Sequence, residues 1–166
     1  LALSSSANAQ SGSILNITST SGASSTGILA QLNITSTTSA QKALQLLNIG
    51  TGLSLDVQGA AAFRKAADFA GVGTQNNAVF GNGSIVRLTG ISAQIITGIA
   101  NGVDGKMLTI MNAGIATATI SNQLGLSTSA NRIITGQGAD MLVGPNQSVL
   151  MMYDSGSNRW RMIGGS

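Results

Sequence analysis

The chain of 166 residues contains no cysteine, no histidine and no glutamate, and a single proline, Pro145. The missing cysteine and histidine exclude a Ser-His-Asp triad, a cysteine nucleophile and the usual zinc or copper ligand sets. A glycosidase-type carboxylate pair would have to come from the few aspartates. These absences favour a structural or binding protein over an enzyme. We therefore expect no catalytic residues, no metal site and no cofactor.

Charge is also scarce, because charged residues make up 8% of the chain, against about 25% in an ordinary soluble domain. The net charge is +3, and no run of basic residues exceeds two. Nucleic acids bind clustered basic stripes, so we expect no nucleic-acid partner. No segment approaches the roughly 20 apolar residues of a membrane span, so we expect no membrane insertion. A surface of Ser, Thr, Asn and Gln is typical of extracellular and viral fibres.

A short phrase recurs in the first sixty residues, where Lys42 and Asp56 are the only charged side chains. It is present as Leu15-Asn16-Ile17, Leu32-Asn33-Ile34 and Leu47-Asn48-Ile49, and more weakly as Leu55-Asp56-Val57. The spacing is about 16 positions, which is characteristic of an internal repeat. Each copy alternates apolar and polar residues, the pattern of a half-buried strand.

A single copy of this phrase has nothing within itself against which to bury its apolar edge, so repeats must stack or chains must associate. We interpret residues 13–59 as a repetitive β-stalk, β-helix-like or prism-like, formed by three chains. Disorder is the alternative, because Ser/Thr/Gly-rich segments often lack a core. The expected oligomerisation stripe consists of Leu15, Ile17, Leu32, Ile34, Leu47, Ile49, Leu55 and Val57.

Two further segments flank the stalk. We expect residues 1–12 to be a flexible leader within a longer chain, although Ala7-Asn8-Ala9 also fits a signal-peptidase site. Residues 60–83 are expected to form a neck and linker. The alanine-rich stretch 58–71 predicts a short helix, because Phe63, Ala66, Ala67 and Ala70 would form one stripe. A strand that continues the stalk is the alternative.

From Ser84 to the last residue, apolar or alternating runs are separated by turn signals every eight to twelve residues. This texture predicts an all-β head over 84–166, an antiparallel β-sandwich, barrel or jelly-roll-like fold. We expect Trp160 to fill the core while Arg159 and Arg161 face outward; the alternative is an exposed aromatic–Arg patch that stacks on a sugar. The expected strands are Ile85–Thr89, Gln94–Ile99, Lys106–Asn112, Thr117–Ser121, Arg132–Thr135, Met141–Val143, Ser148–Tyr153 and Arg159–Ile163, and Asp154–Asn158 join the last two as a hairpin.

Several phrases of the head resemble the C-terminal domains of bacteriophage tail-fibre and appendage proteins. They are Asp104–Asn112, Ala130–Gly136, Ser148–Asp154 and Asn158–Arg161. The leading repeats look like the stalks of those fibres. The resemblance implies a parallel homotrimer on the surface of a virion, attached to other virion proteins and contacting a host glycan or protein. Our candidates for receptor contact are Asp154, Asn158, Arg159 and Arg161.

Two other functions remain open at the level of sequence. The chain is alternatively a cellular extracellular filament or surface-layer subunit, whose strands would be exchanged head to tail to give an open polymer. A carbohydrate-cleaving enzyme that uses aspartate pairs is less favoured, because no pair has a sequence context that would raise a pKa.

Overall fold

The computed structural model describes residues 44, 46, 51 and 53–165. The chain divides into two units, Leu1–Gln58 and Gly59–Ser166. The second unit is all-β with almost no helix; one 3₁₀ turn, η1, covers Ser129–Asn131. Its strands are β1 (Gly73–Gln75), β2 (Ile85–Leu88), β3 (Gln94–Ile96), β4 (Met107–Asn112), β5 (Ala118–Ile120), β6 (Ile133–Ile134), β7 (Met141–Val143), β8 (Ser148–Asp154) and β9 (Arg159–Gly165).

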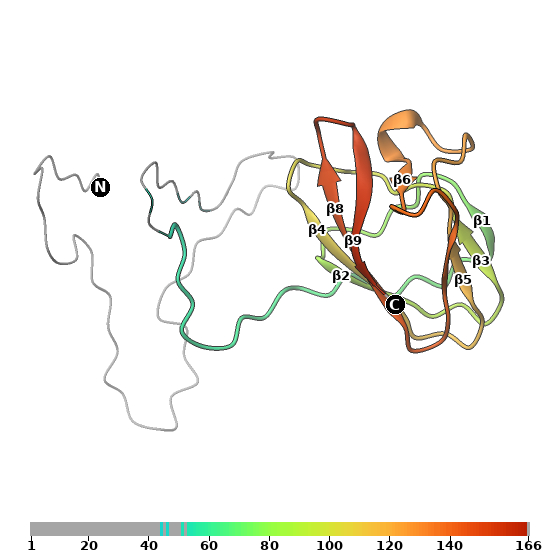
Figure 1. Ribbon diagram of the computed structural model, residues 1–166. Coiled ribbons are helices and arrows are strands. Elements are labelled where there is room, and N and C mark those ends of the chain that lie inside the picture. Colours follow the sequence, from blue (N-terminus) through green and yellow to red (C-terminus); the bar gives the residue numbers. More distant parts are fainter. Residues whose placement is uncertain (1–43, 45, 47–50, 52, 166) are drawn as a thin grey trace, which may run out of the picture. The chain divides into compact units, whose positions relative to one another are not determined.

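The first half of this unit is a stack of three similar coils, arranged like those of a β-solenoid (Figure 1). Residues 65–78 form the first coil, 85–99 the second and 109–122 the third. Strand β3 pairs in parallel with β1 on one side and β5 on the other, and β2 pairs in parallel with β4. Isolated parallel bridges, Lys65 to Ile85 and Ala78 to Ile99, tie the first coil to the second. Each coil thus repeats the path of the coil before it.

One corner of the stack requires glycine. A Cβ on Gly90 would lie 2.7 Å from the carbonyl oxygen of Gly71, and a Cβ on Gly114 would collide with the carbonyl oxygen of Gly90. The three glycines therefore lie one above another, where successive coils approach too closely for a side chain.

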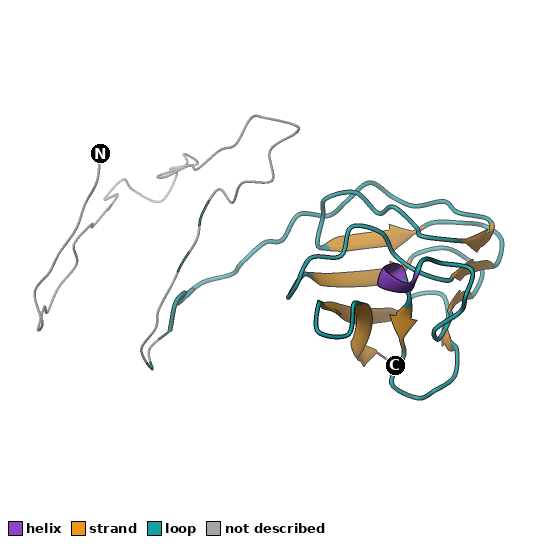
Figure 2. Cartoon of the chain, turned by 90° about the horizontal axis from the view of Figure 1, so that it is seen from above, coloured by secondary structure: helices purple, strands orange, loops and turns teal. Residues whose placement is uncertain are grey.

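The chain reverses after the third coil. Strand β7 pairs antiparallel with β5, and β8 pairs antiparallel with both β4 and β9, whereas β6 pairs in parallel with β9. The result is a four-stranded sheet, β1-β3-β5-β7, and a five-stranded sheet, β2-β4-β8-β9-β6 (Figure 2). The all-β part of the prediction for the head is confirmed, but its antiparallel arrangement was wrong. Both sheets are mixed, because stacked coils pair in parallel and only the returning strands run the opposite way.

The core lies between the two sheets and takes apolar side chains from both. Trp160 is fully buried, its indole nitrogen donates to the carbonyl oxygen of Ile99 at 2.8 Å, and its ring meets that of Tyr153 edge to face. The prediction that Trp160 fills the core is confirmed, and this ring is not available to stack on a sugar. The other fully buried large side chains are Leu88, Ile96, Ile99, Leu108, Ile110, Ile120, Ile133, Met151, Val86, Val143 and Val149.

The predicted helix over 58–71 was also wrong. The segment is extended and pairs with β2: the amides of Ala66 and Phe69 donate to the carbonyl oxygens of Ile85 and Arg87 at 2.7 and 2.8 Å. A helix this short is only marginally stable in water, and its stripe of alanines would bury little apolar area. Backbone hydrogen bonds to the neighbouring coil therefore make the extended conformation the more stable one. Residues 65–78 lie within the stretch 60–83 that was expected to be a neck and linker, but they belong to the stack and include strand β1.

Candidate interaction surfaces

The four candidates for receptor contact come together at the β8–β9 hairpin. The carboxylate of Asp154 accepts hydrogen bonds from the Ser157 hydroxyl at 2.7 Å and from Arg161 Nε at 2.6 Å. These two groups, the Ser157 hydroxyl first, lower the pKa of Asp154 from 3.8 to about 2. Arg159 donates from Nε to the side-chain oxygen of Gln123 at 2.9 Å and from Nη1 to the carbonyl oxygen of Asn158 at 2.8 Å.

These contacts give the hairpin residues a role in building the turn. The amide of Gly156 donates to Asp154 at 2.9 Å, and Asn158 has a φ of 51°, the left-handed conformation that asparagine tolerates. Asp154 and Arg161 form a partly exposed ion pair held in one geometry by neighbours on the same hairpin. Contact of this pair with a receptor stays a prediction.

Most of the oligomerisation stripe lies outside the described residues. Leu15, Ile17, Leu32, Ile34, Leu47 and Ile49 belong to that part. Leu55 and Val57 are described, and their side chains are 65% and 50% exposed in the single chain. If these two side chains belong to an interface, the atoms that bury them lie outside the described residues.

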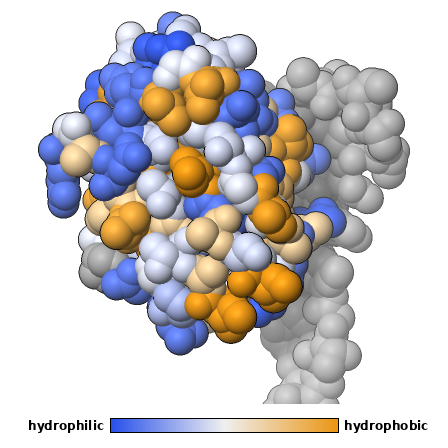
Figure 3. Space-filling model, turned by 90° about the vertical axis from the view of Figure 1, so that its right-hand side faces the viewer, coloured by the Kyte–Doolittle hydropathy of each residue, from blue (hydrophilic) through white to orange (hydrophobic). Residues whose placement is uncertain are grey.

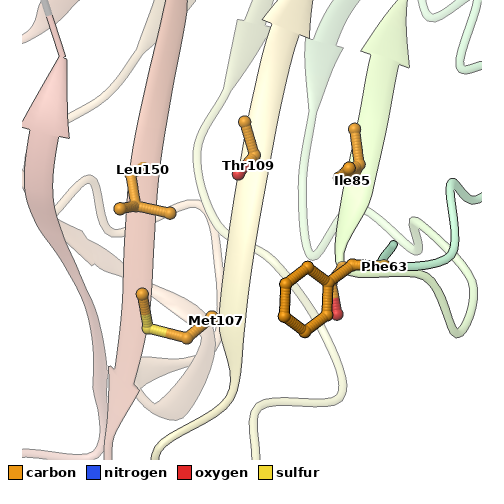
Figure 4. A pocket seen from close by; sticks show the side chains of 6 residues that line it. Phe63, Ile85, Met107, Thr109 and Leu150 are labelled. Atoms are coloured by element: carbon orange, nitrogen blue, oxygen red, sulfur yellow. The ribbon is translucent and has the colours of Figure 1, made fainter. Parts of the chain in front are cut away.

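An apolar groove that the sequence analysis missed crosses the outer face of the five-stranded sheet. It is lined by Phe63, Ser84, Ile85, Met107, Thr109 and Leu150, and its volume is about 260 Å³. Ile85, Thr109 and Leu150 lie in register on β2, β4 and β8, while Met107 and the ring of Phe63 lie along one edge of this row (Figure 4). Phe63 is 70% exposed although it lines the groove.

The sequence did carry a signal for the groove. Residues 149–153 are five consecutive apolar residues. A strand with one solvent-exposed face would instead alternate apolar and polar residues. Val149, Met151 and Tyr153 point into the core, so Leu150 and Met152 must lie on the outer face. A strand that is apolar on both sides indicates that both sides of its sheet meet another surface.

One acidic side chain near this groove, Asp68, is paired with two basic ones. Asp68 accepts from Lys65 Nζ at 2.7 Å and from Arg87 Nη1 at 3.2 Å. The hydrogen bond from Lys65 is the main cause that lowers the pKa of Asp68, and Arg87 adds to it. Arg87 lies on the same strand as Ile85, and Arg161 is the cross-strand neighbour of Met152. The Asp68 cluster therefore lies beside the groove, whereas Arg64 and Lys106, next to Phe63 and Met107 in the sequence, form no ion pair within the described residues.

The four-stranded sheet presents a different surface, which we call the neutral face. No residue of β1, β3, β5 or β7 carries a charge. Thr74, Ile95, Thr119 and Leu142 form a register row across its outer side. Val72, Ile91 and Ile115 each follow one of the stacked glycines, and they are 64%, 78% and 78% exposed.

Figure 3 shows the side of the molecule on which the four-stranded sheet lies, with apolar side chains gathered in several patches among polar ones. Isolated exposed apolar residues are common on soluble proteins, but rows of them are typical of contact surfaces. The neutral face therefore suits an uncharged partner.

In the described part of the chain, no three acidic side chains approach one another as metal ligands would. No helix among these residues has the length and apolar character needed to cross a bilayer. The remaining acid with a shifted pKa is Asp104, whose pKa is lowered chiefly by the backbone amide of Ser155, which donates to it at 2.9 Å. Such a carboxylate stays ionised and fastens a loop.

Comparison with known proteins gives this chain no relative: no family model matches it, and neither curated proteins nor solved structures provide a match.

Proposed function

We propose that the chain is a structural and adhesive subunit of a virion appendage, a tail fibre, short appendage or capsid fibre. In this proposal residues 13–59 form a homotrimeric β-stalk, and the second unit is a β-sandwich or jelly-roll-like head. The assembly stands on the surface of a virion particle, attached to other virion proteins. Its heads contact a glycan or protein of the host surface.

The main support for the proposal is that both sheets of the second unit expose apolar side chains on their outer surfaces. The apolar groove lies on one sheet and the neutral face on the other. A chain that works alone in water has no use for apolar side chains on both outer sheet faces. An appendage needs both, because one surface joins subunits and the other meets a partner.

Trimerisation also gives weak surface contacts a physical advantage. The neutral face has no charged residue in its strands, so a single contact lacks the strong ion pairs and charge-assisted hydrogen bonds of tight complexes. Three identical heads on one stalk raise the effective concentration of the second and third contacts. Modest affinity per head is then sufficient for stable attachment.

The mass of the purified chain in solution, measured by light scattering after size exclusion, tests the proposal. We expect a trimer, and we expect Leu32→Asp with Ile34→Asp to abolish it by placing charges in the stripe. The matched control, Asn33→Asp with Thr35→Asp, adds the same charges at the intervening polar positions and leaves the trimer intact. A wild-type monomer, or a trimeric stripe variant, would contradict the proposal.

The filament alternative makes a different prediction for the same sample. Head-to-tail strand exchange gives open polymers whose mass grows with concentration and whose images show helical repetition. A closed particle with threefold symmetry has a fixed mass. Electron micrographs of the purified chain therefore separate the two functions.

A further inference from the structure

We infer that Arg132 and Arg159 form a binding site for an oxyanion, the carboxylate or sulfate group of an acidic saccharide. The two arginines are neighbours on the outer face of the five-stranded sheet, where β9 meets the edge strand β6. The inference goes beyond the proposed function, because it concerns one ligand group on one head and holds whether or not the heads trimerise.

Strand register places the two arginines side by side. Ile133 of β6 pairs in parallel with Trp160 of β9, and both side chains are fully buried. Arg132 and Arg159 each come one residue earlier, and the amide of Trp160 donates to the carbonyl oxygen of Arg132 at 3.0 Å. Because successive side chains of a strand point to opposite faces, both arginines leave the sheet on its outer side. Like charges at neighbouring positions repel each other, so an anion bound by both would be stabilising.

The acid opposite Arg159 is already used by a third arginine. Asp154 pairs with Arg159 in the β8–β9 register, but its carboxylate accepts from Arg161 Nε at 2.6 Å instead. Every ion pair among the described residues uses another base, so neither Arg132 nor Arg159 belongs to one. The diagonal pair of Asp154 and Arg161 thus leaves the two neighbouring arginines without a counter-charge.

The loop that follows the third coil holds both arginine side chains. Arg159 Nε donates to the side-chain oxygen of Gln123 at 2.9 Å, and Arg132 Nε donates to the carbonyl oxygen of Ser127 at 3.0 Å. Arg159 Nη1 also donates to the carbonyl oxygen of Asn158 at 2.8 Å. Within the described part of the chain, Nη2 of Arg159 and both Nη atoms of Arg132 have no hydrogen-bond partner. Guanidinium groups that are already oriented bind oxyanions with little further loss of rotamer freedom.

The surroundings of the two arginines favour a saccharide as the bearer of the anion. A nucleic acid binds along a continuous basic stripe, whereas here two unpaired arginines lie beside neutral polar residues. Gln123 and Asn158 are exposed, and among the described residues the side-chain nitrogen of each has no acceptor. Free amide groups next to two fixed cations can bond the hydroxyl groups of a sugar that carries an acid group.

Binding of the full-length chain to immobilised polygalacturonate and to dextran sulfate tests the inference, with neutral dextran as the reference polymer. We expect binding to at least one acidic polymer and none to dextran, and the tighter of the two identifies the oxyanion. Arg132→Gln with Arg159→Gln should weaken binding on the order of tenfold or more, because charge-assisted hydrogen bonds are lost. The matched control, Arg64→Gln with Arg87→Gln, removes the same charge near β2, at the opposite edge of the sheet, and should bind like the wild type.

Gln123→Glu provides a second variant that removes no arginine. The new carboxylate would keep the acceptor for Arg159 Nε and supply the missing counter-charge, so binding should fall by a similar factor in a folded chain. Gln147→Glu is the matched control. Its side-chain oxygen accepts from the amide of Gly144 at 2.6 Å, in the turn before β8 and at the other end of that strand from the hairpin. This control should leave binding unchanged.

The inference is overturned if the wild type binds neither acidic polymer, or if the variants lose no more affinity than their controls. Tighter binding of a single-stranded DNA oligomer than of both polysaccharides would also overturn it, because the arginines would then serve a phosphate backbone. The mass of the chain in solution decides the proposed function separately. A trimer that binds neither acidic polymer contradicts the inference alone, and a monomer that binds one contradicts the trimeric appendage alone.

Discussion

The indole nitrogen of Trp160 donates a hydrogen bond of 2.8 Å to the carbonyl oxygen of Ile99, which lies 61 positions earlier in the chain. The bond joins β9 to the end of the second coil, and both side chains are buried. One contact therefore ties the C-terminal hairpin to the stack of coils.

Trp160→Phe should remove this bond and leave a buried carbonyl without its donor. We expect a loss of about 1–3 kcal/mol in the free energy of unfolding, with a further cost for the smaller ring. Urea unfolding followed by circular dichroism measures it. Val79→Ala, at a side chain that is 62% exposed, is the control and should change stability by less than about 0.5 kcal/mol. Equal stabilities for the two variants would contradict the structural role of the bond.

Asn112→Ala should also be strongly destabilising, because Asn112 is buried at a junction of three segments. Its side-chain nitrogen donates to the carbonyl oxygens of Ala116 and Val143 at 2.9 and 2.7 Å, and its oxygen accepts from the amide of Gly114 at 3.0 Å. Loss of these partners predicts a destabilisation of roughly 2–4 kcal/mol. The exposed Asn82 provides the comparison: Asn82→Ala should leave the denaturation midpoint almost unchanged.

Gly90→Ala tests the close approach of coils at the glycine corner. The added methyl group would lie 2.7 Å from the carbonyl oxygen of Gly71, so the two coils must move apart at a cost of about 1–3 kcal/mol. Gly59→Ala is the matched control, since no atom lies within 4 Å of the added Cβ. Thermal unfolding should show a lower midpoint for Gly90→Ala alone. Equal midpoints would mean that the coils are not closely stacked at this corner.

Acid sensitivity should arise partly from Asp154. Its pKa falls from 3.8 to about 2 in the folded chain because the Ser157 hydroxyl and Arg161 donate to its carboxylate. A lowered folded-state pKa adds stability that is complete above the unfolded pKa and is lost as the pH falls through the folded value. Asp154→Asn should therefore lose less thermal stability than the wild type between about pH 5 and pH 2.

Ser157→Ala should also reduce the loss of thermal stability between about pH 5 and pH 2, though by less than Asp154→Asn. The reason is that the Ser157 hydroxyl is the largest cause of the lowered pKa of Asp154. Ser148→Ala changes a serine at the opposite end of β8 from Asp154 and should keep the wild-type dependence of thermal stability on pH. Some acid sensitivity remains in every variant, because Asp68 and Asp104 also have lowered pKa values. Identical profiles for wild type and Asp154→Asn would refute the assigned role of this carboxylate.

Most strands of the second unit could be predicted from local pattern. The runs around Ile110, Ile120 and Met151 are apolar or alternate between apolar and polar residues, and turn residues bound each of them. Each forms a strand close to its expected bounds. The hairpin between β8 and β9 and the burial of Trp160 were also expected from the local pattern. By contrast, β1 has no apolar residue, and only its pairing with β3 makes it a strand.

The candidate surfaces were less predictable. The four hairpin candidates, Asp154, Asn158, Arg159 and Arg161, could be named from the sequence, yet the sequence could not show that their polar groups bond to neighbours on the same hairpin. The groove combines residues from four separate segments, Phe63, Ile85, Met107 and Leu150 among them. No local pattern brings these together, because their proximity depends on strand order and register.

The sequence by itself set the low charge of the chain through its composition. It also determined that the second unit is all-β, because the apolar runs and the turn residues between them act over a few neighbouring positions. Only the tertiary structure decided that the coils stack in parallel, that 65–78 joins the stack as extended chain, and that apolar side chains remain on both outer faces. The physical reason is that backbone hydrogen bonds between coils and the burial of side chains from two sheets are long-range terms. They outweighed the helical preference of alanine between Ala60 and Ala70.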